Sequence, residues 1–343
     1  MLALAGLAWA STPVLLARGL GMAGGTAQLL VALAGLAAGI LLLALATRHP
    51  FNGLRLKLIS HWHPPSLPTI LLTGLALRLI WVGAFPASPS SDGATYLGLA
   101  ERLLNEGCYE TSGTRAYWPP GYPFFLTPWL WAFSPKLAVI LSQLALYLAG
   151  AFGCYKLAQT LSGDQAGRLA ALLFSVWPNL IALTGTPEKE ALVLAILPWV
   201  CIGVVRPHIL PMALAGLALG FATLVQPSLQ FLLIAFAVLI PMLHGWRKLH
   251  GAILLVVCAA AVIAPWTLRN YQQFGQFVLV STNGGDNFYR ANNPLADGGY
   301  TKLEDIKVLA AAAVTAYVPV ATPRDKTPDP HAAQPSDAPV IAE

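Results

Sequence analysis

Long apolar runs alternate with short polar segments along most of this chain. A membrane-spanning helix needs about 20 mainly apolar residues, and runs of about that length recur as far as residue 267. We predict nine spans, over residues 3–17, 26–46, 68–85, 136–157, 167–184, 189–205, 209–225, 228–243 and 251–267. The pattern therefore predicts an all-α, polytopic integral membrane protein.

One segment between these runs, residues 86–135, is too polar to cross a bilayer. Ser90 or Ser91 can cap a helix that ends at Gly107, and Tyr96 lies on its apolar face. Aromatic rings follow, and such rings prefer the depth of lipid headgroups. They are Tyr117, Trp118, Tyr122, Phe124, Phe125, Trp129, Trp131 and Phe133. We expect this segment to form interfacial helices on the membrane surface.

The chain changes character after residue 268. Residues 269–318 are polar and include a strand-like run, Phe277 to Val280, and a candidate helix over 303–318. Residues 319–343 alternate Pro, Ala and charged residues, a composition that cannot bury a core, so we expect disorder. The predicted organisation is an N-terminal transmembrane hairpin and loop (1–67), a transmembrane core (68–268), an outer polar segment (269–318) and a tail (319–343).

Composition supports the membrane prediction. Of 343 residues, 56% are hydrophobic and only 10% are charged, and the mean hydropathy is +0.63, whereas soluble domains carry roughly 25% charged residues. The net charge is +5, but the basic residues are spread over the loops, so a nucleic-acid partner is not expected. Of the four cysteines only Cys108 lies outside the apolar spans, so neither a disulfide framework nor a zinc site is supported.

The charges also predict an orientation. Basic residues gather in alternate loops, which the positive-inside rule places in the cytoplasm, and Asp164 is the one acid on that side. The 86–135 loop, the 185–189 turn and everything after residue 268 then face outward. We therefore expect a multi-pass membrane protein whose candidate site lies on the outer side.

Three outer acids are candidates for chemistry. Asp92, in the first turn of the predicted helix, could take a proton from a hydroxyl or an amine, or it could simply complement the helix dipole. Glu188 and Glu190 lie in a short outer turn, where they could assist Asp92 or bind a sugar. The alternative for this pair is a solvated turn with Lys189 as a local partner, and the sequence does not separate the two acids.

Three arginines are candidates for binding an anion. Arg78 lies inside the 68–85 span, where a charge costs at least about 2.5–3.5 kcal/mol, so it should face protein or water and could meet a phosphate or an intramembrane partner. Arg269 and Arg290 lie on the outer side, and a guanidinium matches a phosphate with two parallel hydrogen bonds. For Arg269 the alternative is anchoring at the membrane edge.

Three groups of segments together resemble the bacterial polyprenyl-phosphate-dependent glycosyltransferases of the GT-C class, the family 39-like group that includes protein O-mannosyltransferases and the lipid A aminoarabinose transferase. The resemblance covers about residues 68–300. The first group is Asp92-x3-Tyr96-x3-Ala100 followed by residues 119–123 (PPGYP), and the second is 186–190 (TPEKE). The third is 265–271 (PWTLRNY) followed by 281–285 (STNGG) and 292–294 (NNP).

This resemblance implies an inverting glycosyltransferase that moves a sugar from a polyprenyl-phosphate donor to a lipid, glycan or protein acceptor. Asp92 would be the general base, and Glu190 or Glu188 would assist it. Basic residues would stabilise the phosphate as it leaves. The expected substrate-binding residues are Arg78, Tyr96, Arg115, Tyr122, Lys189, Arg269 and Arg290. The expectation requires Asp92 to share a water-accessible cavity with arginines that hold the lipid's anionic head.

The chain also departs from that family. Gly93 follows Asp92 where many members have a second acid, which leaves a divalent metal without support, and Gln226 stands where the family often has arginine. The chain ends earlier than most members. Two other functions therefore stay open: a transporter or flippase of lipid-linked sugars, whose ionisable groups would lie at mid-membrane on discontinuous helices, and a truncated, non-catalytic scaffold.

Overall fold

The computed structural model describes residues 64–111, 113–206 and 208–292. Every regular element in these ranges is a helix, apart from one isolated β-bridge between Thr111 and Thr114, so the all-α prediction is confirmed for this part of the chain. The predicted spans at 3–17 and 26–46, the helix at 303–318 and the tail lie outside the described residues. The chain divides into two compact units, Met1–Gly284 and Gly285–Glu343.

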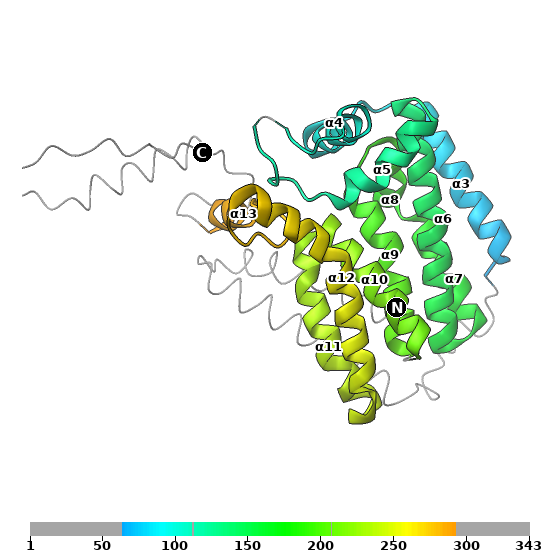
Figure 1. The fold of residues 1–343 in the computed structure, drawn as a ribbon. Helices are drawn as coiled ribbons and strands as arrows, with labels where there is room; N and C mark the ends of the chain where they lie inside the picture. Colours follow the sequence, from blue (N-terminus) through cyan, green and yellow to red (C-terminus); the bar gives the residue numbers. More distant parts are fainter. Residues whose placement is uncertain (1–63, 112, 207, 293–343) are drawn as a thin grey trace, which may run out of the picture. The chain divides into compact units, whose positions relative to one another are not determined.

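The helices of the first unit follow one another with short connections, except for the loop over residues 107–120 (Figure 1). They are α3 (Leu67–Ala84), α4 (Ser91–Glu106), α5 (Gly121–Ala132), α6 (Pro135–Ser162), α7 (Asp164–Val176), α8 (Pro178–Ala182), α9 (Lys189–Val205), α10 (Ile209–Val225), α11 (Gln230–His244) and α12 (Leu249–Phe274). Short 3-10 turns occur at Leu183–Gly185, Pro227–Leu229 and Trp246–Lys248. The helix α13 (Gly284–Ala291) begins at the boundary of the second unit.

Four helical segments among the described residues are long and apolar enough to span a membrane: Leu67–Ala84, Pro135–Ser162, Pro227–His244 and Trp246–Phe274. A fifth span results if Asp164–Val176 and Pro178–Gly185, which are bent by 56° at their junction, cross together. The predicted number of nine is not confirmed. The helices α9 and α10 have 17 residues each, which gives about 26 Å at 1.5 Å per residue against roughly 30 Å of hydrocarbon.

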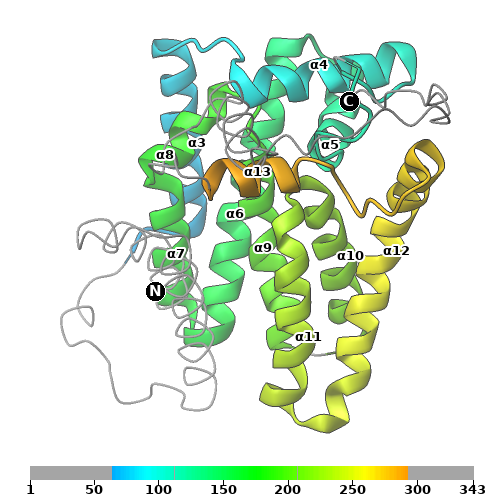
Figure 2. The ribbon, with the colours of Figure 1, turned by 90° about the vertical axis from the view of Figure 1, so that its left-hand side faces the viewer.

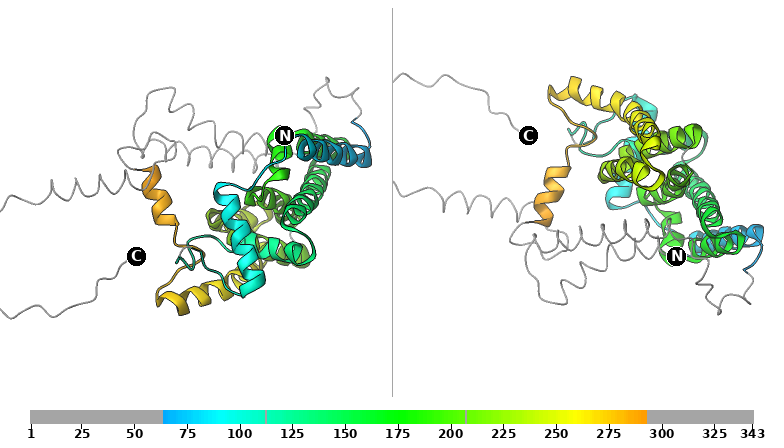
Figure 3. Two further views of the ribbon diagram at one scale, coloured as in Figure 1. Left: turned by 90° about the horizontal axis from the view of Figure 1, so that it is seen from above. Right: turned by 90° about the horizontal axis from the view of Figure 1, so that it is seen from below.

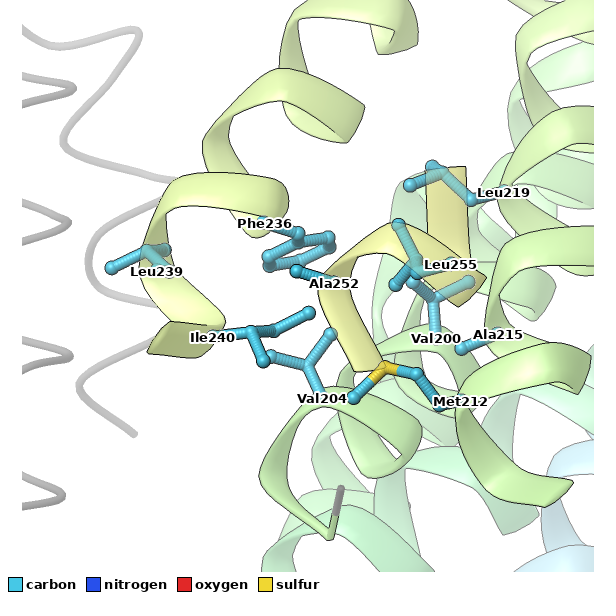
Figure 4. Close-up of a cluster of buried hydrophobic side chains, with 10 residues drawn as sticks. All are labelled: Val200, Val204, Met212, Ala215, Leu219, Phe236, Leu239, Ile240, Ala252 and Leu255. Atoms are coloured by element: carbon cyan, nitrogen blue, oxygen red, sulfur yellow. The ribbon is translucent and has the colours of Figure 1, made fainter. Parts of the chain in front are cut away.

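Small residues let the long helices of the first unit pack closely. The helix α10 lies against both α9 and α12, and α6 lies against α7 and α9. A Cβ atom at Gly220 would come within 2.6 Å of the backbone oxygen of Ala259, so glycine permits the contact between α10 and α12. Figure 4 shows the apolar cluster where four helices meet. Its buried members are Val200, Val204, Met212, Ala215, Leu219, Phe236, Leu239, Ile240, Ala252 and Leu255.

Two shorter helices, α4 and α5, lie across one end of the bundle of long helices (Figures 2 and 3). The helix α4 ends at Gly107, whose left-handed φ of 66° suits a glycine C-cap, as the sequence predicts. The helix α5 packs closely on α10, because a Cβ atom at Gly121 would come within 2.6 Å of the Val225 backbone nitrogen. At this end of the bundle α4 meets the turn that carries Glu188.

The run from Phe277 to Val280 is not a strand, so that expectation is wrong. No strand runs beside it among the described residues, and side chains of α12 bind its backbone instead. Trp266 Nε1 donates to Val280 O at 2.7 Å, and Thr267 Oγ1 donates to Leu279 O at 2.8 Å. Asn270 Nδ2 donates to the carbonyls of residues 278 and 280 at 3.1 and 3.2 Å. One face of a helix therefore satisfies the carbonyls that a neighbouring strand would otherwise bind.

Candidate functional site

The first turn of α4 lies against the turn that precedes α9. A Cβ atom at Gly93 would come within 3.3 Å of Pro187 Cγ and 3.4 Å of Glu188 Oε1. Asp92 is in the first turn of α4, Glu188 is the N-cap residue of α9, and Glu190 is in the first turn of α9. Two helix N-termini therefore bring three carboxylates to one place, where the helix dipoles favour negative charge.

Tyr96 and Lys189 complete this group. Tyr96 is 1% exposed, and Lys189 Nζ lies 5.5 Å from the centroid of its ring. The Tyr96 pKa is raised by burial first, and then by the negative charges of Asp92, Glu190 and Glu188. All three carboxylates therefore act electrostatically on one hydroxyl. We call Asp92, Tyr96, Glu188, Lys189 and Glu190 the acidic cluster.

Gln143, which the sequence did not single out, fixes the turn that carries Glu188. It is 3% exposed on α6, and its Nε2 donates to Thr186 O at 3.0 Å and to Glu188 O at 3.3 Å. The same nitrogen donates to the hydroxyl of Tyr122, a predicted substrate-binding residue, at 3.2 Å. The only signal in the sequence was a lone glutamine inside an apolar span. Tyr122 thus borders the acidic cluster, and its hydroxyl is already bound by the residue that fixes the turn.

The acids of the cluster differ in their surroundings. Burial, and then the charges of Glu190 and Asp92, raise the pKa of Glu188, while Lys189 opposes this shift. Asp92 is exposed. Ser91, directly before Asp92, has a φ of 49° and is the only non-glycine residue with positive φ in the described part of the chain. Such a conformation is costly for serine and is typical of functional sites.

Clustered acids can bind cations, so the acidic cluster was compared with a metal site. Within residues 64–111, 113–206 and 208–292, no group of three or more His, Cys, Asp or Glu side chains is placed to hold a metal ion. The approach of Gly93 to Glu188 also explains why a second acid next to Asp92 fits poorly here. A longer side chain at residue 93 would press against Pro187 and the Glu188 carboxylate.

A second polar feature lies at the other end of α4. It is an open groove of about 420 Å³, which we call the arginine groove. Its floor includes Tyr109, Phe124 and Trp266, whose rings pack with centroids 5.0 to 6.1 Å apart. The full lining is Leu103, Gly107, Cys108, Tyr109, Glu110, Arg115, Phe124, Trp266, Arg269 and Gln273. Asp92 is not among these residues.

The two arginines of this groove bind protein groups. Arg269 donates from Nη1 to Arg115 O at 2.6 Å and from Nη2 to Tyr109 O at 3.2 Å, and it stacks 4.7 Å from the Trp266 ring. Arg115 Nη1 donates to Gln273 Oε1 at 2.8 Å, and its Nε lies 3.4 Å from a Glu110 carboxylate oxygen. These contacts tie the loop after α4 to the end of α12.

The resemblance required Asp92 to lie in one cavity with arginines. The structure does not bring Asp92 together with Arg115 or Arg269. Leu103, the first residue of the groove, lies eleven positions after Asp92 on the same helix. At 1.5 Å per residue this is about 16 Å along the helix axis. The separation arises because α4 is an unbroken helix with the acids at its start and the groove at its end. Lys189 is the basic residue of the predicted set that lies in the acidic cluster.

Arg78 also has protein partners. It is 1% exposed on α3, and its Nη1 donates to Gly74 O at 3.1 Å and to Ser175 O at 2.9 Å. Its guanidinium carbon lies 3.7 Å from the centroid of the Tyr147 ring. Ser175 is in the last turn of α7, just before the bend, where carbonyls lose their helical partners. Arg78 thus caps a broken helix and complements the negative end of its dipole.

Arg290, the remaining predicted cation, lies on α13. Its Nε is 3.0 Å from Asp286 Oδ2, one turn earlier on the same helix. Both residues belong to the second unit. Arg290 is therefore not assigned to the acidic cluster.

Comparisons with known proteins add no assignment. Neither a scan against protein-family models nor a search of curated proteins found a match for this chain. The likeness to polyprenyl-phosphate-dependent glycosyltransferases therefore remains a resemblance in sequence, and a functional assignment depends on the chemistry of the acidic cluster.

Proposed function

We propose that this chain is a membrane glycosyltransferase that moves a sugar from a polyprenyl-phosphate donor to an acceptor at the outer face of a cytoplasmic membrane. The acceptor is a lipid, a glycan or a protein. The observation that carries the proposal is the approach of the first α4 turn, with exposed Asp92, to the turn that bears Glu188. A carboxylate that water and substrate can reach, beside further acids, is suited to general base catalysis.

In the proposed reaction Asp92 accepts the proton of the acceptor's hydroxyl or amine. The acceptor atom forms a bond to the anomeric carbon on the face opposite the phosphate. The carbon–oxygen bond to phosphate breaks, and its electron pair leaves with the polyprenyl phosphate, so the configuration inverts. Lys189 offsets part of the repulsion between the three acids and the leaving phosphate, and a single charged group in such a role is typically worth a few kcal/mol.

Glu188 would act differently from Asp92. Its raised pKa keeps it protonated to a higher pH than an ordinary glutamate, so it can donate a hydrogen bond as well as accept one. We therefore assign the orientation of the substrate to Glu188 and the acceptance of the proton to Asp92. Arg115 and Arg269 have no part in the step, because they hold the loop at the far end of α4.

The proposal is tested with the purified full chain in nanodiscs and a panel of polyprenyl-phosphate sugars. Mass spectrometry would follow the release of free polyprenyl phosphate and the gain of one sugar by candidate acceptors. We expect release from at least one donor, and none from heat-inactivated protein. Failure to release polyprenyl phosphate from any donor, with the protein folded and inserted, would contradict the proposal.

One observation favours a second function, the transport of a lipid-linked sugar. Transporters place ionisable groups on discontinuous helices, and Arg78 caps the carbonyl end of α7 at the bend between α7 and α8. Proteoliposomes loaded with a fluorescent lipid-linked sugar would show movement between leaflets without any sugar transfer. Loss of that movement in Arg78→Met, with sugar transfer absent throughout, would favour the transporter.

A further inference from the structure

The Tyr96 hydroxyl is the one fully buried side-chain polar atom of the described residues that has no hydrogen-bond partner. Its neighbours in the same region are satisfied. Tyr109 Oη donates to Trp118 O and Pro119 O at 3.1 and 3.0 Å, and Tyr122 Oη accepts from Gln143. Buried hydroxyls without partners are rare and costly, so each one requires an explanation.

Packing holds the Tyr96 ring in place. Its ring meets Trp118 and Tyr122 edge-on, with centroids 5.5 and 5.7 Å away. Both contacts restrict displacement of the ring, so the hydroxyl oxygen has little freedom to move towards another protein group. Burial and the neighbouring acids also raise the Tyr96 pKa, so the hydroxyl keeps its proton and can donate a hydrogen bond.

The groups around this hydroxyl define what could bind it. Asp92, Glu188 and Glu190 supply acceptors when ionised, and Lys189 supplies the only positive charge of the acidic cluster. A phosphate would meet three carboxylates and one ammonium, a balance that repels it. An ammonium ligand could donate to the carboxylates but could not accept from Tyr96. A ligand hydroxyl can do both, because it accepts one hydrogen bond and donates another.

We infer that the Tyr96 hydroxyl donates a hydrogen bond to a hydroxyl group of the sugar, which in turn donates to a carboxylate of the acidic cluster. This inference rests on the proposed function and deepens it. Tyr96 becomes a specificity-determining residue, and the acidic cluster binds the sugar instead of the lipid's phosphate. Because the sugar hydroxyl supplies the missing partner, the cost of the buried hydroxyl is removed only when the sugar is bound.

The test compares Tyr96→Phe with Tyr109→Phe, which removes the same atom from a buried tyrosine whose hydroxyl is already bound by protein. The first measurement is the melting temperature of each full-length variant in nanodiscs without ligand. We expect Tyr96→Phe to melt at or above the temperature of the unmodified chain, because no hydrogen bond is lost. Tyr109→Phe should melt lower, since two carbonyls lose their donor.

The second measurement is binding, by saturation-transfer NMR, of methyl mannoside, methyl glucoside and methyl arabinoside. Inorganic phosphate and ethanolamine serve as competing probes of the other two chemistries. We expect a methyl glycoside to bind the unmodified chain and Tyr109→Phe equally, and to bind Tyr96→Phe about 3- to 10-fold more weakly, as fits one neutral hydrogen bond. Neither phosphate nor ethanolamine should displace the glycoside.

Three results would overturn the inference: a melting temperature of Tyr96→Phe lowered as much as that of Tyr109→Phe, glycoside binding that is equal in Tyr96→Phe, or displacement of the glycoside by phosphate or ethanolamine. Its failure is distinguishable from that of the proposed function. If Tyr96-dependent glycoside binding occurs without transfer, the glycosyltransferase proposal fails and the binding site stands. If transfer occurs and Tyr96→Phe leaves the donor KM unchanged, the inference about Tyr96 fails alone.

Discussion

The two ends of α4 use polar residues in opposite ways. At the C-terminal end, Arg269, Arg115 and Asn270 point their donors at backbone carbonyls or at a nearby amide. At the N-terminal end, three acids gather around one ammonium and a buried hydroxyl that has no partner. Matched donors and acceptors hold a loop in place, whereas an unmatched group costs stability and requires another reason to be there.

The difference follows from what each end must support. The loop after α4 and the segment after α12 contain no strand among the described residues, so their carbonyls need side-chain donors. The acidic cluster has no such task, because Gln143 already holds the turn that bears Glu188. The arginine groove and the acidic cluster thus differ in whether their polar groups already have hydrogen-bond partners within the protein. Four predictions test this difference.

The largest expected effect on stability is that of Asn270→Ala. Asn270 is fully buried and donates to two carbonyls, and a buried carbonyl left without a donor costs about 1–3 kcal/mol. We expect a clear fall in melting temperature, equivalent to about 2–3 kcal/mol. The exposed neighbour Gln272→Ala is the control and should melt normally. A normal melting temperature for Asn270→Ala would show that α12 does not hold residues 278–280.

A smaller loss of stability is expected for Arg269→Lys. Lysine keeps the charge but cannot reach the Arg115 and Tyr109 carbonyls with one planar fork. We expect about 1–2 kcal/mol of destabilisation, measured as a lower melting temperature, and unchanged KM for a polyprenyl-phosphate donor. A raised donor KM at an unchanged melting temperature would instead identify Arg269 as a phosphate ligand and would reverse the comparison between the two ends.

The pH dependence of stability should reflect Glu188. Because its pKa is raised in the folded chain above its ordinary value of 4.5, the folded state holds a proton that the unfolded state has lost. Stability contributed by this group therefore falls as pH rises from about 4.5 through the raised pKa. Glu188→Gln should flatten this part of the melting-temperature profile.

Glu190→Gln sharpens the same measurement. Glu190 is the neighbouring charge that contributes most to the raised pKa of Glu188, so its removal should move the falling part of the profile to lower pH. Glu101→Gln, elsewhere on α4, should leave the profile as it is. A profile that Glu188→Gln does not alter would mean that the turn before α9 does not hold this carboxylate against Asp92 and Glu190.

The smallest effect is expected for Arg115→Gln. Its ion pair with Glu110 is exposed on both sides, with 52% and 38% of the side chains accessible, and such pairs contribute at most about 1 kcal/mol. We expect the melting temperature and the rate of sugar transfer to stay close to those of the unmodified chain. A large loss of transfer would assign the arginine groove to the reaction.

The sequence predicted the helices well where a single periodic pattern decided the outcome. The helix from Ser91 to Glu106 with its glycine C-cap, and the helices α9 and α10, occur where their apolar patterns placed them. The predicted strand-like run failed because β-branched residues alone cannot supply a partner strand. The predicted number of spans is not confirmed, since apolar composition does not distinguish a 17-residue helix packed on its neighbours from one that crosses a bilayer.

The candidate site was predictable only in part, for a physical reason. The acids Asp92, Glu188 and Glu190 stood out because charges are rare in this chain, and the structure brings them together. The roles expected for Arg115 and Arg269 needed distances that no sequence pattern contains, and the length of α4 keeps them from Asp92. Gln143 and the lack of a partner for Tyr96 depend on contacts between helices that are far apart in the chain.

The most direct test of the acidic cluster as the reactive end is sugar transfer by Asp92→Asn. The asparagine has the same shape but is not basic, so we expect the rate of polyprenyl phosphate release to fall about 10²- to 10⁴-fold. Asp92 is exposed, so the melting temperature should not change, and Glu101→Gln on the same helix should transfer normally. Release by Asp92→Asn at the rate of the unmodified chain would contradict the account.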